Sequence, residues 1–258
     1  MSCVNGTTCK SGGTCEAACN ERSYVCKCQQ FNKGEHCEQW TTDVLSCKDI
    51  LSKTSYRKDM AYTLLIDDKQ TDIYCHLSSN HCGSGGWTLA MKIDGSKTAQ
   101  FGYSSSLWSN KESYNLTAGQ TGFDNYQTKM PSYWAMPFYK LCVGLKVGND
   151  LRWAAISYNA SSLYDVIADG KFRVFSIGKA TWLSLIAKSS MQANCNMEGF
   201  NIGKARIGIK SNQENECKSP DSTIGFGLSY GFSSGNRCLY TCSNGEKKTI
   251  AFGYIMIQ

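Results

Sequence analysis

The sequence predicts an α+β protein that consists of a small disulfide-rich module followed by a larger domain in which strands dominate. Seven of the 15 cysteines lie within the first 40 residues, and the other eight are spread over the rest of the chain. After residue 40, apolar runs of strand length alternate with turns rich in glycine, asparagine and aspartate. Helix-like spacing of apolar residues is rare there. We therefore divide the chain into residues 1–40 and 41–258.

The bulk composition excludes several classes of protein. Of the 258 residues, 41% are hydrophobic and 19% are charged, which is the balance of a globular protein. The formal net charge is +6, but the lysines and arginines are scattered, so we expect no nucleic-acid groove. No apolar run reaches the ~18 residues that a membrane span requires.

The cysteine content predicts an oxidising compartment. Zinc sites need paired cysteine and histidine ligands at set spacings, and the chain has only three histidines. Three N-x-S/T sequons, at Asn5, Asn115 and Asn159, agree with secretion and are the predicted glycosylation sites. Residues 1–25 are polar and lack the apolar core of a secretory leader. We therefore expect that Met1 opens a mature or recombinant form of a secreted, extracellular protein.

The N-terminal segment is too short to fold on a hydrophobic core alone and needs crosslinks. It contains "SGGTC", then Cys26-Lys-Cys28, and its last cysteine after eight further residues. This pattern resembles an EGF-like module. The resemblance implies a two-stranded sheet held by the disulfides Cys3–Cys15, Cys9–Cys26 and Cys28–Cys37.

That framework leaves Cys19 over, and the cysteine total is odd. One alternative pairs Cys19 with a cysteine of the larger domain. The other is an intermolecular bridge through Cys19, which would make a homo-oligomer. Calcium-binding EGF-like modules carry an acidic stretch before their first cysteine. Only Met1 and Ser2 precede Cys3, so we predict no calcium in this module.

The larger domain contains segments whose apolar pattern predicts strands. The predicted strands cover residues 61–66, 87–93, 140–147, 151–158, 171–178, 181–187, 205–211 and 249–257. The last is apolar on both faces, which indicates a central buried strand. Residues 43–53 have helical spacing, and Asp43 can cap that helix.

The start of the larger domain resembles a fibrinogen-related domain. The resemblance is carried by Cys47-Lys-Asp-Ile-Leu51, Tyr62-Thr-Leu64, Tyr74-Cys75 and Gly85-Gly86-Trp87-Thr88. It implies a Cys47–Cys75 disulfide, a twisted and mostly antiparallel sheet, and a Trp87 buried beneath it. Residues 103–115 and 122–138 are similar to cnidarian skeletal organic matrix proteins, which combine EGF-like and fibrinogen-related modules. The C-terminal part is more distantly similar to intelectins.

The sequence predicts no enzyme. Residues 231–235, "GFSSG", match the G-x-S-x-G pattern of a serine-hydrolase nucleophile turn. That turn requires a following helix and a later histidine, whereas every histidine precedes Ser233, and Cys238 and Cys242 follow it closely. We interpret the motif as an ordinary turn.

The candidate metal site lies in the segment 211–242, which we interpret as a cysteine-anchored loop. Asn212 and Glu214 resemble the intelectin pattern Asn-x-Glu-x-x-Cys, which implies a calcium ion that holds the vicinal diol of a sugar. Asp221 is the nearest further acidic ligand, and Asn215 stands where intelectins have histidine. Calcium, which prefers oxygen ligands, is the one cofactor predicted. The alternative is a solvated loop whose side chains bond to their own backbone.

Aromatic residues provide a second, metal-free route to a glycan, because sugar rings stack on aromatic faces. The full predicted ligand set is Asn212, Glu214, Asn215, Tyr230, Phe232 and Tyr240. We predict a secreted, lectin-like protein that binds glycans or glycoproteins, with calcium assistance. The alternatives are a structural or adhesive matrix protein acting through protein–protein contacts, and a ligand module for cell receptors.

Overall fold

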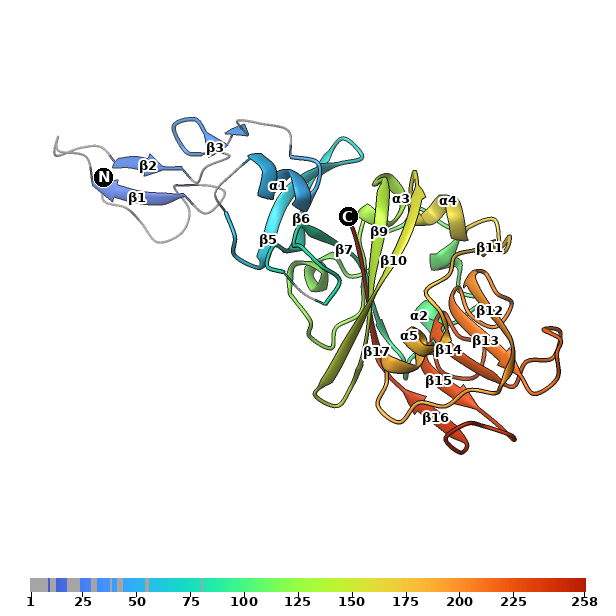
Figure 1. The fold of residues 1–258 in the computed structure, drawn as a ribbon. Helices are drawn as coiled ribbons and strands as arrows, with labels where there is room; N and C mark the ends of the chain where they lie inside the picture. Colours follow the sequence, from blue (N-terminus) through green and yellow to red (C-terminus); the bar gives the residue numbers. More distant parts are fainter. Residues whose placement is uncertain are drawn as a thin grey trace. The chain divides into compact units, whose positions relative to one another are not determined.

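The computed structural model describes residues 9, 13–17, 24–28, 32–37, 39–40, 44–53, 56–79 and 81–258. The chain divides into two compact units, Met1–Leu45 and Ser46–Gln258. The boundary therefore lies a few residues beyond position 40, where the cysteine framework places it. Figure 1 labels the elements of each unit.

The small unit contains two antiparallel strand pairs. Strand β1 (Thr14–Ala17) pairs with β2 (Tyr24–Lys27), and β3 (Asn32–Lys33) pairs with β4 (Gln39–Trp40). The structure contains the Cys9–Cys26 and Cys28–Cys37 bridges that the EGF-like resemblance implies. Cys15 is also disulfide-bonded. Cys3, Cys19 and the sequon residue Asn5 lie outside the described residues.

The larger unit holds a seven-stranded and a six-stranded sheet, and every strand pairing in them is antiparallel. The resemblance implies one twisted, mostly antiparallel sheet, so the antiparallel pairing agrees with it, whereas the second sheet was not predicted. The first sheet has the order β10-β9-β17-β7-β6-β5, with β8 paired to β7. Its strands are β5 (Met60–Ile66), β6 (Lys69–His76), β7 (Trp87–Asp94), β8 (Thr128–Lys129), β9 (Phe138–Val147), β10 (Asp150–Ala160) and β17 (Phe252–Ile257). Strand β17 is central and buried along its whole length, as its two apolar faces predict. Trp87 is fully buried on β7, as the fibrinogen-related resemblance implies.

The six-stranded sheet corrects the interpretation of the segment 211–242. Its order is β11-β12-β13-β14-β15-β16. The strands are β11 (Arg173–Val174), β12 (Asn194–Phe200), β13 (Ile207–Asn212), β14 (Ser222–Phe226), β15 (Ser234–Cys238) and β16 (Lys247–Ile250). Two of them, β14 and β15, lie inside the stretch that we interpreted as one loop. Its glycines suggested turns, but Gly225 and Gly235 lie in these strands.

A row of four glycines crosses this sheet, with Gly199, Gly208, Gly225 and Gly235 paired in register on β12 to β15. A Cβ on Gly225 would lie 2.2 Å from the carbonyl oxygen of Ile207 on the neighbouring strand. The φ angles of Gly225 and Gly235, +155° and +138°, are also ones that only glycine adopts without strain. The glycines therefore allow a close approach of the strands that a side chain would prevent.

The helices are short. They are α1 (Cys47–Lys53), α2 (Thr98–Phe101), α3 (Ser132–Ala135), α4 (Leu163–Ile167) and α5 (Lys179–Ser184), with the 3-10 turns η1 (Ser106–Trp108) and η2 (Leu116–Gln120). Helix α1 lies within the predicted 43–53, but Ser46 caps it, because its hydroxyl accepts the N–H of Asp49 at 3.1 Å. The predicted cap, Asp43, lies outside the described residues. None of these helices approaches the length of about 20 residues needed to cross a bilayer, and no membrane span is found in the described part of the chain.

The strands predicted at 171–178 and 181–187 are largely wrong. The first segment forms only the two-residue strand β11. The second begins in helix α5, since its buried residues Trp182, Leu185 and Ile186 follow helical rather than alternating spacing. The indole N–H of Trp182 donates to the Glu198 carboxylate at 2.8 Å. Helix α5 contacts β10 of the first sheet and both β13 and β14 of the second, so it joins the two layers.

Four disulfides tie the larger unit together. They are Cys47–Cys75, which the resemblance implies, and Cys82–Cys142, Cys195–Cys217 and Cys238–Cys242. All eight cysteines of this unit thus have a partner within it, so the alternative that pairs Cys19 with one of them is wrong. The intermolecular bridge through Cys19 stays a prediction. Together with the two bridges of the small unit, these crosslinks fit an extracellular protein.

The glycine row predicts a large cost for adding one methyl group to the six-stranded sheet. We expect Gly225→Ala to lower the free energy of unfolding by about 3 kcal/mol, because overpacking adds to backbone strain. Gly170→Ala is the matched control. It has a positive φ of +71° with no atom near the added methyl group, and it should cost about 1 kcal/mol. Urea unfolding of both variants measures the difference, and equal losses would refute the close-approach explanation.

Candidate functional site

A cleft of about 440 Å³ opens between the segment α2–η1 and the chain that follows β14. Thr98, Ser104 and Ser229 are exposed lining residues that carry hydroxyl groups, and Gly231 also lines the cleft. Tyr103 lines it as a half-buried aromatic residue. Two segments that are far apart in sequence thus build one polar hollow.

Direct contacts join the two walls of this cleft. The Tyr103 N–H donates to the carbonyl of Leu228 at 3.2 Å. From behind, the Arg206 Nε donates to the Tyr103 carbonyl at 2.8 Å, and its guanidinium lies 4.5 Å from the Tyr103 ring centroid. Trp108 is fully buried, and its indole N–H donates to the carbonyl of Gly102 at 3.1 Å. The cleft is therefore held in shape by the core of the unit.

The chemistry of the cleft suits a ligand rich in hydroxyl groups. Its volume falls within the usual range of small-molecule sites, about 300–1,000 Å³. Hydroxyls donate and accept hydrogen bonds, and an aromatic edge can contact the apolar face of a sugar. The wall at 228–231 lies within the predicted segment 211–242, but none of the predicted ligand residues lines the cleft, and the wall around Thr98 and Ser104 was not predicted. Only the fold brings that wall close.

The predicted residues at the end of β13 lie together but do not line the cleft. Asn212 is fully buried, and its side-chain N–H donates to the Glu216 carboxylate at 2.6 Å. Its amide oxygen accepts the N–H of Gln213 at 3.0 Å. Glu214 and Asn215 are exposed, and Glu214 accepts a hydrogen bond from Gln213 at 2.8 Å. These contacts correspond to the alternative of a loop bonded to itself.

Glu216 completes this loop, since it also accepts the hydroxyl of Ser219 at 2.7 Å and the N–H of Lys218. These hydrogen bonds lower the pKa of Glu216. Among the described residues, no group of three or more histidine, cysteine or acidic side chains could hold a metal ion. Calcium binding by Asn212, Glu214 and Asp221 stays a prediction. It would require the buried amide oxygen of Asn212 to exchange the N–H of Gln213 for the ion.

The three predicted aromatic residues have different environments. Phe232 as a sugar platform is wrong, because it is fully buried in a small core with Ile202 and Leu228. Tyr240 is 65% exposed within the Cys238–Cys242 ring. Tyr230 is half-buried, and its hydroxyl lies 3.1 Å from the Thr223 hydroxyl.

The serine of the "GFSSG" motif has a structural contact. Ser233 is fully buried, and its hydroxyl donates to the carbonyls of Asp94 at 2.9 Å and Lys97 at 3.1 Å. These bonds fasten the turn before β15 to the end of β7. The turn interpretation accounts for all of these contacts.

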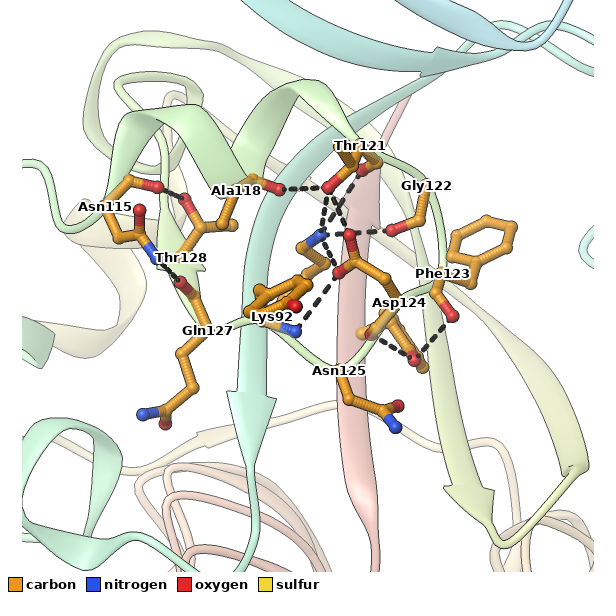
Figure 2. Close-up of polar contacts among 12 residues, drawn as sticks. Lys92, Asn115, Ala118, Thr121, Gly122, Phe123, Asp124, Asn125, Gln127 and Thr128 are labelled. Carbon is orange, nitrogen blue, oxygen red and sulfur yellow. Dashed lines mark hydrogen bonds and ion pairs between the residues drawn. The ribbon is translucent and has the colours of Figure 1, made fainter.

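A second hollow, of about 280 Å³, lies beside the residues of Figure 2. Its lining includes Asn115, whose side-chain N–H donates to the Gln127 carbonyl at 3.1 Å, and Tyr126, which is 68% exposed. Asn115 is one of the predicted glycosylation sites. The other described one, Asn159, is exposed on β10. Glycosylation at both stays a prediction.

Asp124, which lines this hollow, belongs to an ion pair with Lys92 that fastens the 121–127 loop to the first sheet. Lys92 on β7 is fully buried, and its amine donates to the Asp124 carboxylate and to the carbonyls of Thr121 and Gly122, as Figure 2 shows. Burial lowers the pKa of Lys92. Burial alone would raise the pKa of Asp124, but hydrogen bonds from Lys92, Thr121 and the Tyr126 N–H outweigh it and lower that pKa.

Comparison with known proteins finds similarity among solved structures only. No family model matches the sequence, and no curated protein matches it either. Among solved structures, the fibrinogen-like globe domain of human ANGPTL2 is similar, with 13% identity and a TM-score of 0.37. The match covers 83% of this chain and 98% of that domain. At this level of similarity, the EGF-like and fibrinogen-related resemblances stay predictions from the sequence.

The Lys92–Asp124 pair predicts a pH-dependent contribution to stability. We expect Asp124→Asn to lower the free energy of unfolding by about 2 kcal/mol at pH 7, because it leaves a buried ammonium unpaired. The folded-state pKa of Asp124 is depressed, so this contribution is present above the unfolded pKa of about 3.9 and is lost as the pH falls through the folded value.

Urea unfolding at pH 7 and at pH 3 should therefore show a gap between wild type and Asp124→Asn that shrinks in acid. The control is Lys92→Met/Asp124→Asn, which removes the buried charge and should recover part of the loss. A gap that is independent of pH would contradict the electrostatic origin.

Proposed function

We propose that this chain is an extracellular, non-enzymatic recognition protein whose larger unit binds glycans in the cleft beside Tyr103. The observation that carries the proposal is the cleft itself. It combines exposed hydroxyls from two segments with one aromatic residue, and the buried Trp108 supports it through a hydrogen bond to the lining residue Gly102.

The character of the cleft supports binding rather than catalysis. Serine and threonine hydroxyls attack substrates only when a neighbouring base activates them, and no histidine, carboxylate or lysine is among the lining residues. The same hydroxyls and the backbone groups offer hydrogen bonds to a ligand. Contacts of this kind on a pre-formed surface limit the entropy lost on binding.

Two further points support an extracellular setting for this function. The described disulfides need an oxidising compartment. Sequons at Asn115 and Asn159 lie on exposed positions of the same unit. Calcium assistance through Asn212 and Glu214 is a separate part of the proposal, because neither residue lines the cleft.

Filling the cleft tests the proposal. Ala99 is an exposed lining residue, and Ala99→Trp should occupy the cleft without disturbing the core. We expect it to weaken binding to the array glycans that wild type recognises by about tenfold or more, or ~1.4 kcal/mol. The control is Ala187→Trp, which places the same side chain at another exposed position.

Both variants should keep the wild-type melting temperature. Loss of binding in Ala99→Trp alone supports the cleft as the site, whereas unchanged binding in that variant refutes it. Repeating the array with EDTA tests the calcium part separately.

A further inference from the structure

Three cations stand in one row across the six-stranded sheet. Lys210 on β13 pairs with Thr223 on β14, Thr223 with Arg237 on β15, and Arg237 with Lys248 on β16. Side chains of directly paired residues project from the same face of a sheet. The row therefore gathers positive charge on one face, with the buried Thr223 hydroxyl between Lys210 and Arg237.

Tyr230 brings a fourth cation to the same place. Its hydroxyl meets Thr223 at 3.1 Å, and the guanidinium of Arg237 lies 4.3 Å from its ring centroid. On the same ring, the amine of Lys204 lies 5.7 Å from the centroid. We call Lys204, Lys210, Arg237 and Lys248 the cation cluster.

No acidic side chain is in direct contact with the cation cluster among the described residues. In the part of the chain that the structure describes, none of its four side chains forms an ion pair or a hydrogen bond. The Nε of Arg237 is enclosed and has no partner. Two acidic residues act on this region at longer range. The charge of Glu216 raises the pKa of Lys210, and the charge of Asp221 raises the pKa of Tyr230. Glu216 is already bonded to its own loop.

Lys210 is the most unusual member, because only 8% of it is exposed. Burial lowers its pKa, the charge of Lys204 lowers it further, and Glu216 opposes this. Its amine has no hydrogen-bond partner within the described part of the chain but is not fully enclosed, so solvent can reach it. An unpaired cation in such a place is costly for the free protein. An oxyanion that reaches it gains Coulomb attraction at reduced screening, and Arg237 can offer it paired N–H donors.

The cation cluster and the cleft share one short loop. Ser229 and Gly231 line the cleft, while the side chain of Tyr230, between them, contacts the cluster. We propose that the cation cluster binds the sulfate or carboxylate group of an acidic glycan whose neutral part occupies the cleft. This inference rests on the proposed function and names its ligand class.

Binding of matched oligosaccharides to the full chain tests the inference. The probes are a heparin octasaccharide, the same length of desulfated N-acetylated heparin, which keeps its carboxylates, and an uncharged chitooligosaccharide. We expect the heparin probe to bind best, and its affinity to fall as NaCl rises, because salt screens the attraction.

Lys210→Gln/Arg237→Gln should weaken binding of the acidic probe about tenfold or more in calorimetry at low salt. The control Lys140→Gln/Lys188→Gln removes the same charge from exposed positions elsewhere in the unit and should bind as wild type does. The melting temperature of the cluster variant should stay unchanged or rise, because the variant removes an unpaired buried charge.

The outcomes separate the two proposals. Strong binding of the desulfated probe assigns the site to carboxylates, and binding of heparin alone assigns it to sulfates. Equal losses in the cluster and control variants, or no preference for acidic probes, overturn the anion site. In that case the glycan cleft still stands if Ala99→Trp abolishes uncharged binding, and it falls independently if Ala99→Trp has no effect.

Discussion

Close approach of strands at the glycine row is the constraint on which the candidate sites of the larger unit depend. Gly225 lets β14 approach β13, and Gly235 lets β15 approach β16, at points where a Cβ would meet a carbonyl oxygen of the neighbouring strand. Their register in turn sets the row that contains Lys210 and Arg237. The same strands support the loop that forms one wall of the cleft. Backbone geometry, rather than side-chain chemistry, thus brings the polar groups together.

Local patterns in the sequence were enough to predict much of the fold. The double-sided apolar run at the C-terminus predicted a central strand, and β17 occupies that place. Prediction was wrong where two signals conflict. Residues 181–187 are apolar enough for a strand, but they begin in a helix that buries the Trp182 side chain. The glycines of 211–242 indicate turns, although Gly225 lies in a strand of the sheet.

The candidate site could be predicted only in part, because its two walls are more than a hundred residues apart. The amides and acids of the polar segment 211–242 predicted a ligand site there, yet Asn212 is buried and hydrogen-bonded to Glu216. The cation cluster gave no signal in the sequence. Lys204, Lys210 and Arg237 are not consecutive, and their proximity follows from strand register, which composition does not reveal.

The loop that carries Tyr230 has a consequence for how this surface can be altered. Ser229 and Gly231 line the cleft, while Tyr230 contacts the cation cluster, so a backbone shift of this loop moves both at once. Substitutions on its two sides should therefore be thermodynamically coupled instead of additive. Under the proposed function, a change in the preference of the cleft for neutral sugars would also change the selectivity of the cation cluster for charge.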